Sequence, residues 1–258
     1  MDIEKIVDFE KAKQVFEEYL NGYDREDDRI KLKIIHTYCV VDCSREIALR
    51  MKLSNEDVQL AMLIGLLHDI GRFEQLKRYD SFEASTMDHA AQGVQTLFEE
   101  GMIRQFIQDD QFDELIRTAI AKHSDFKLEG IEDERILLHA RLIRDADKLD
   151  NYRVKLEETT DTLLRKTPEE IGQEVITDKV FEDACHRKSI FSPDRKTAMD
   201  YWVSYIVYIY DINFKETLQI IKEKNYVPAI IHRIPYSNPD TIEKMNRIEM
   251  DVMDYISF

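Results

Sequence analysis

The stretch Leu60-Ala61-Met62-Leu63-Ile64-Gly65-Leu66-Leu67-His68-Asp69-Ile70-Gly71-Arg72 decides the fold of this chain. The eight residues before His68 are all apolar or glycine, and a helix that is apolar on every side is buried in a protein core. Gly71 is a candidate C-terminal stop for this helix. The inner end of the predicted core helix then carries His68 and Asp69. Adjacent helical residues diverge by about 100°, so these side chains reach different sides of a site, as a terminal and a bridging ligand would.

Further potential metal ligands lie on both sides of this stretch. His36 precedes it, and His89, His123 and Asp147 follow it. With the His-Asp pair they make four imidazoles and two carboxylates, which is the set that two divalent ions need when they share one bridging carboxylate and leave room for water or substrate. We therefore expect two transition metal ions, which can be Fe, Mn, Co, Ni or Zn because imidazole and carboxylate accept all of them.

Two segments resemble the HD-domain metal-dependent phosphohydrolases, whose pattern is His…His-Asp…Asp. They are Leu66-Leu67-His68-Asp69-Ile70-Gly71-Arg72 and Arg144-Asp145-Ala146-Asp147-Lys148-Leu149-Asp150, and the resemblance spans roughly His36 to Asp150. It implies that a first metal is bound by His36, His68, Asp69 and Asp147. Dinuclear members of the superfamily carry two more histidines before the last Asp, and His89 and His123 are similarly placed. The resemblance thus implies that Asp69, His89 and His123 bind a second metal.

Other roles stay open for some of these histidines. His89 opens one predicted helix and His123 closes another, and histidines at helix ends are common at protein surfaces through dipole and capping effects. His139 lies two turns before Asp147 on a predicted helix. It is either a proton donor to a leaving oxygen or an ordinary helix histidine.

Basic residues near the predicted ligands are candidates for binding an anionic substrate. Lys148 directly follows Asp147, and in related phosphohydrolases a basic residue at this place contacts phosphate. On an ideal helix Arg144 and Lys148 share a stripe beside Asp147, and Lys33 lies one turn before His36. The alternative for such residues is a solvated charged face. We expect Asp69, Arg72 and Lys148 to act in catalysis, and Lys33, Arg72, Arg144 and Lys148 to bind substrate.

The composition restricts the partners and the compartment. The net charge of −16 over 258 residues opposes nucleic-acid binding, which needs an excess of Lys and Arg. The three cysteines have no paired spacing and suit a reducing interior. The acidic N-terminus differs from a signal peptide, and no apolar stretch is long enough to span a bilayer. These observations predict a soluble cytoplasmic protein with a small phosphorylated substrate, no nucleic acid and no membrane partner; they leave the oligomeric state undecided.

Helical periodicity dominates the rest of the chain and predicts an all-α fold. We expect one domain, with an HD-type bundle around the metals over about residues 25–155 and a helical extension packed on it over about 156–258. The segment Phe73 to Met87 is predicted to be a loop over the site or an ordinary connector. Helices are predicted at Ile3–Leu20, Arg29–Met51, from Ser54 to the His-Asp pair, at Gln111–His123, Glu132–Asp150, Lys196–Lys224 and Thr241–Tyr255.

Three functions fit these features. The first is hydrolysis of a phosphate ester or anhydride in a small nucleotide-like molecule, with a metal-activated hydroxide as nucleophile. The second is a di-iron oxygenase, because the same ligand pattern also resembles myo-inositol oxygenase and phosphonate-cleaving relatives. The third is a non-catalytic signalling module on the same fold. Basic residues near Asp147 favour the first.

Overall fold

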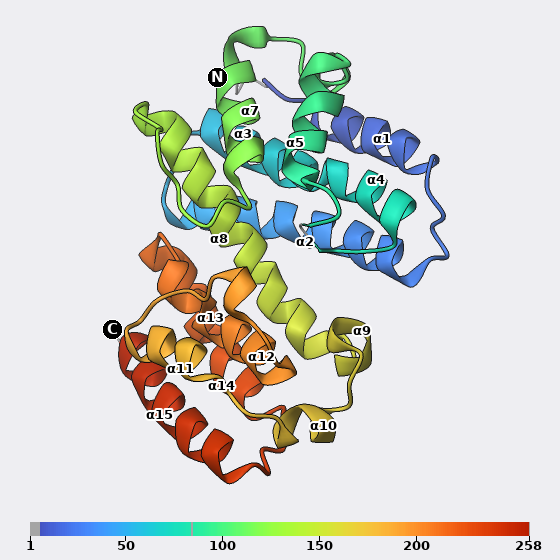
Figure 1. Cartoon of the computed structure of the whole chain (residues 1–258). Helices are drawn as coiled ribbons and strands as arrows, with labels where there is room; N and C mark the ends of the chain where they lie inside the picture. The colour runs from blue at the N-terminus through green and yellow to red at the C-terminus, as the bar shows by residue number, and fades with distance from the viewer. Residues whose placement is uncertain (1–5, 84, 258) are drawn as a thin grey trace. The chain divides into compact units, whose positions relative to one another are not determined.

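Figure 1 shows the computed structural model of the chain, which describes residues 6–83 and 85–257. Every regular element within these ranges is a helix, which confirms the predicted all-α class. No helix among the described residues combines the length and the apolar composition that a bilayer span requires. The α-helices are α1 (Phe9–Leu20), α2 (Asp28–Arg50), α3 (Asn55–Leu67), α4 (Ile70–Tyr79), α5 (His89–Val94), α6 (Ile103–Phe106), α7 (Asp113–Lys122), α8 (Glu134–Glu157), α9 (Thr160–Leu164), α10 (Pro168–Gln173), α11 (Asp178–Cys185), α12 (Ala198–Ile206), α13 (Lys215–Glu223), α14 (Tyr226–Ile231) and α15 (Pro239–Tyr255), with short π or 3-10 turns at Gln95–Glu99, Asp110–Phe112, Ser192–Asp194 and Val207–Asp211.

The chain divides into two compact units, Met1–Asp150 and Asn151–Phe258, and the division falls inside α8. In the first unit α3 packs against α1, α2 and α7, and α4 packs against α2 and α5. In the second unit α12 packs against α10, α11 and α14, and α11 also packs against α15. The expectation that the C-terminal extension packs on the HD core as part of one domain stays a prediction.

Helix α3 is the core helix that the sequence predicts. It begins where the Ser54 hydroxyl accepts a hydrogen bond from the amide of Asp57, an N-cap that satisfies one of the free amides of the first turn. All eight residues from Leu60 to Leu67 except Met62 are buried. Gly65 lets α2 approach closely, because a Cβ there would lie 3.2 Å from the Cα of Val41. The apolar run thus becomes the centre of the first unit.

The expectation that Gly71 stops the core helix is wrong. Helix α3 ends at Leu67, the backbone turns at Asp69 (φ −105°, ψ 17°), and α4 begins at Ile70. Gly71 lies inside α4, where a Cβ would meet the carbonyl oxygen of His89 at 2.2 Å. The glycine is therefore needed for the contact between α4 and α5, a long-range feature that local sequence signals do not reveal.

The prediction of a loop from Phe73 to Met87 is also wrong for its first half. Helix α4 continues to Tyr79 and ends at Asp80, which has left-handed backbone angles (φ 46°, ψ 42°). Phe73, Gln75 and Leu76 are buried, so this polar-looking segment carries a narrow apolar face. Only the part after Tyr79 is a connector to α5.

The single long helix predicted at Lys196–Lys224 is wrong as well. Helix α12 ends at Ile206, a 3-10 turn covers Val207–Asp211, Ile212 is extended, and α13 begins at Lys215. Tyr152 Oη donates a hydrogen bond to the carbonyl oxygen of Ile206 at 3.3 Å. This side chain satisfies a carbonyl that a continuing α-helix would pair with its own backbone. Three short helices, α9, α10 and α11, precede this region.

Candidate metal centre

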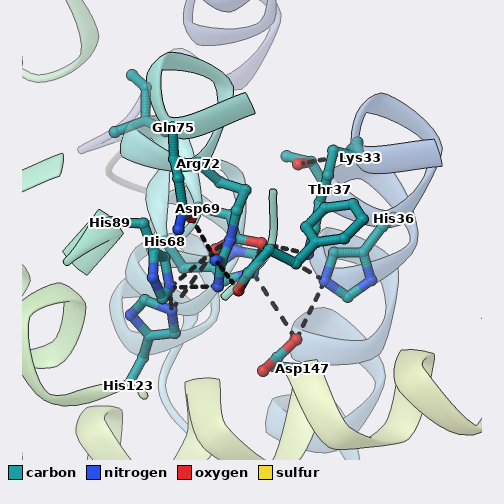
Figure 2. A network of polar contacts seen from close by, with 12 residues as sticks. Lys33, His36, Thr37, His68, Asp69, Arg72, Gln75, His89, His123 and Asp147 are labelled. Carbon is teal, nitrogen blue, oxygen red and sulfur yellow. Dashed lines mark hydrogen bonds and ion pairs between the residues drawn. The ribbon is translucent and has the colours of Figure 1, made fainter. Parts of the chain in front are cut away.

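The six predicted ligands come from six different places in the first unit. His36 lies in the middle of α2, Asp147 lies on α8, and His89 is the first residue of α5. His68 and His123 are the C-caps of α3 and α7, and Asp69 is the N-cap of α4. The four histidine residues and Asp69 are each at most 5% exposed. Figure 2 shows His89 and His123 on one side of Asp69, with His36 and Asp147 on the other.

These side chains form two triads. In each triad the three candidate ligand atoms lie within 4.8 Å of one another. The first triad is His36, His68 and Asp147, and the second is Asp69, His89 and His123. Two imidazoles and one carboxylate in each triad suit a borderline divalent transition metal.

Asp69 faces both triads. Its Oδ2 lies 4.0 Å from Nε2 of His36 and 3.6 Å from Nε2 of His68. Its Oδ1 lies 3.3 Å from Nε2 of His89 and 3.7 Å from Nε2 of His123. One carboxylate with an oxygen towards each triad is the arrangement that a bridging ligand needs.

The opposite ring nitrogens of three histidines are held by acceptors. Nδ1 of His68 lies 2.8 Å from the carbonyl oxygen of Gly65, and Nδ1 of His123 lies 2.7 Å from that of Ile120. Because a carbonyl oxygen only accepts, these Nδ1 atoms carry the protons. Nδ1 of His36 lies 2.7 Å from Oδ2 of Asp150. Such contacts turn the Nε2 lone pair towards a metal and fix the ring orientation.

Two Nε2 atoms are buried among the described residues without a hydrogen-bond partner, those of His36 and His68. Nε2 of His36 is 3.0 Å from Oδ1 of Asp147, but the two groups do not meet in hydrogen-bonding geometry. A buried polar atom without a partner costs free energy, and coordination to a cation would remove that cost. The side chains therefore fit divalent metal ions.

The pKa values of His68, His89 and Asp69 favour the forms that bind metal. Burial lowers the pKa of His68 to about 4, and burial together with the Arg72 cation lowers that of His89 well below its usual value. Burial opposes ionisation of Asp69, but the positive charge of Lys33, the adjacent His68 ring and the positive charge of Arg72 outweigh it and hold the carboxyl pKa low. For His36, burial and Lys33 lower the pKa, yet the adjacent carboxylates of Asp147 and Asp150 raise it overall.

Two of the predicted substrate-binding cations lie at this centre. Lys33 Nζ lies 2.6 Å from Oδ2 of Asp69. Arg72 Nη2 lies 2.9 Å from Nε2 of His89, and its Nε lies 3.7 Å from Oδ1 of Asp69. Arg72 Nη1 donates to Oε1 of Gln75 at 2.5 Å. Positive charge therefore adjoins both triads in an acidic chain, although the predicted roles of these residues in substrate binding and catalysis stay predictions.

The other two predicted cations have different surroundings. Arg144 is buried and donates to the carbonyl oxygens of Lys122, His123 and Asp125, so it holds the chain at the end of α7 where His123 lies. Lys148 is half-buried on α8 beside Asp147. For both residues substrate binding, and for Lys148 also catalysis, stays a prediction.

Asp150, which orients His36, was not predicted from the sequence. A signal existed, because Asp150 lies three residues after Asp147 and residues at that spacing share a helix face. The carbonyl groups of Gly65 and Ile120 have no signal of this kind, since any residue type provides a carbonyl. His139 Nε2 lies 3.1 Å from Oδ1 of Asp57 at the start of α3, which supports its role as an ordinary helix histidine.

Comparison with known proteins supports this description of the first unit. Neither a curated protein nor a solved structure matches the chain. Residues 34–152 match the family model described as the HD domain, and this range contains all six ligand candidates. HD domains bind divalent metals, in agreement with the two triads. Residues 34–152 of the chain therefore form an HD domain.

Proposed function

We propose that this protein is a metal-dependent phosphohydrolase that cleaves a phosphate ester or anhydride of a small nucleotide-like substrate. One observation carries the proposal. A buried carboxylate, Asp69, faces two ligand triads and at the same time contacts Lys33, with Arg72 close by. Ligands for divalent ions and groups that attract an anion therefore adjoin one another.

Divalent ions bound by the triads would supply Lewis acidity towards a phosphoryl oxygen and an activated water. The protein's own residues would orient the ligands, through Asp150 behind His36 and the carbonyl groups behind His68 and His123. Burial of these groups excludes water and strengthens every charge interaction inside the site. The positions of the donors are thus fixed before a substrate arrives.

The basic residues supply charge that complements a phosphoryl group. Arg72 Nε is buried and has no hydrogen-bond acceptor among the described residues, so a phosphoryl oxygen would give it one. Lys33 lies on the opposite oxygen of Asp69. Lys148, next to Asp147, is proposed to contact the same anionic group, as the family resemblance implies. Removing one such electrostatic contact costs on the order of 10²-fold in rate.

The test combines metal analysis of the purified protein with a phosphate-release screen on nucleoside mono-, di- and triphosphates. We expect about two metal ions per chain and release of phosphate from at least one nucleotide. Lys148→Met should retain metal and melting temperature but lose rate, whereas Arg141→Met, an exposed residue two turns earlier on the same helix, should not. Oxygen consumption with bound iron and no phosphate release would replace this proposal by the oxygenase. Bound metal with neither activity would favour the signalling module.

A further inference from the structure

A row of basic residues leads along α2 towards the first triad. Arg29 and Lys33 are four residues apart and His36 lies three residues further, so all three share one face of the helix. The side chains of Arg29 and Lys33 are only 20% and 14% exposed. Long cationic side chains usually extend into water, and this pair instead lies against protein near the metal ligands.

The aromatic ring of Phe82 lies beside both cations. Its centroid is 5.7 Å from Cζ of Arg29 and 5.8 Å from Nζ of Lys33, and the residue is 37% exposed. Its carbonyl oxygen accepts a hydrogen bond from Nη1 of Arg72 at 3.2 Å. An apolar ring at this place lowers the local dielectric constant, which strengthens the attraction between the cations and an anion.

The segment that carries Phe82 is held in place by a buried amide. Nε2 of Gln75 lies 2.9 Å from the carbonyl oxygen of Glu83, 2.9 Å from Oγ1 of Thr86 and 3.2 Å from the carbonyl oxygen of Met87. Gln75 is fully buried in α4. The Gln75 amide therefore holds Phe82 next to Arg29 and Lys33 through hydrogen bonds to the residues that follow Phe82.

Two guanidinium nitrogens of Arg29 can donate hydrogen bonds to an anion. Its Nη1 donates to the carbonyl oxygen and to the carboxylate of Asp80, whose side chain is 78% exposed, and an ion pair with so exposed a partner contributes little. Within residues 6–83 and 85–257, Nε and Nη2 of Arg29 donate to no acceptor. A phosphate group could therefore bind here without breaking a strong contact.

We propose that Arg29, with Lys33 and Phe82 beside it, forms a second anion subsite, which binds a phosphoryl group of the substrate other than the one attacked. This inference rests on the proposed function. Both cations lie within 5.8 Å of the centroid of the Phe82 ring. Lys33 contacts Asp69, so a chain of linked phosphoryl groups would extend from Lys33 at the metal centre to Arg29. The substrate class is then a phosphoanhydride such as a nucleoside di- or triphosphate. A monophosphate ester would leave Arg29 unused.

The test measures binding of two probes, inorganic tripolyphosphate and orthophosphate, to the metal-loaded protein by calorimetry at one fixed ionic strength. In Arg29→Met the charge is removed and the stem is kept. We expect tripolyphosphate to bind about tenfold more weakly or worse, as for the loss of a charged hydrogen bond, and orthophosphate to bind as before. Arg29→Lys should retain part of the affinity. The matched control is Lys31→Met, which removes an exposed charge from the same helix and should change neither affinity.

Three results would overturn the subsite. If Arg29→Met weakens both probes equally, or if Lys31→Met weakens tripolyphosphate as much, the effect is a general loss of charge. If tripolyphosphate binding is unchanged in Arg29→Met while the parent releases phosphate from nucleotides, the subsite is wrong and the proposed function stands. If the metal-loaded parent binds neither probe and hydrolyses no nucleotide, both proposals fail together.

Discussion

At the scale of single residues, Asp69 has the largest predicted effect, because its two oxygens face different triads. In Asp69→Ala the second triad loses one of its three ligands and the first triad loses the carboxylate oxygen that faces it, so we expect the metal content to fall at both and activity to disappear. Metal analysis by mass spectrometry after gel filtration measures this. The control is Asp42→Ala, an exposed carboxylate on α2. Full metal content in Asp69→Ala would refute the bridging role.

Replacing Asp150 tests whether its carboxylate orients His36 as a metal ligand. Asp150→Asn keeps the shape but removes the carboxylate that holds Nδ1 of His36. Substitutions behind a metal-binding histidine weaken metal binding by about 10–100-fold, and we expect a loss of this size for the first triad. Competition with a chelator measures the affinity. The second triad should keep its affinity, and an equal loss at both would indicate a general disturbance of the fold.

The pKa shifts predict different pH dependence for the two triads. The pKa of His36 is raised, so below it a metal must displace a proton from this ring, and affinity at the first triad should fall as the pH falls through that value. His89 has a pKa well below its usual value, so it needs no such proton release at neutral pH. Calorimetric metal titrations between about pH 6 and pH 8, the range of histidine titration, should therefore show the steeper dependence at the first triad. Equal slopes would contradict this assignment.

At the scale of elements, the contact between α4 and α5 controls the second triad. In Gly71→Ala the new Cβ would meet the carbonyl oxygen of His89 at 2.2 Å and the amide of Gly93 at 2.5 Å, so the helices must separate. Forcing a methyl into a packed contact costs about 1–3 kcal/mol. We expect a lower melting temperature together with a lower metal content at the second triad. Gly22→Ala, where the nearest atom is 3.4 Å away, is the control; a stable, fully loaded Gly71→Ala would contradict the prediction.

The contact between α4 and α5 also shows why local sequence patterns predict some helix ends and not others. The start of α3 at Ser54 follows from a local capping signal. The role of Gly71 depends on its contact with His89 and Gly93 in α5, so no local pattern reveals it. The break between α12 and α13 lies where Tyr152 donates to the carbonyl oxygen of Ile206, a contact that no local pattern reveals either. Ligand types were predictable because few residues bind metals, whereas the acceptors behind them are mostly backbone carbonyls.

At the scale of the whole molecule, all six ligand candidates belong to the unit Met1–Asp150 and none to Asn151–Phe258. A ligand that binds only the folded state stabilises the unit that binds it, by about 2.7 kcal/mol at a hundredfold excess over Kd. Metal removal should therefore lower the melting temperature of the site-bearing unit. Differential scanning calorimetry of the loaded and the chelated protein measures the shift. The double variant His36→Ala with His123→Ala has one ligand removed from each triad, so it should show a much smaller shift. A melting temperature that does not respond to metal in the parent would mean that the buried triads are structural polar clusters, because binding to the folded state alone cannot occur without this stabilisation.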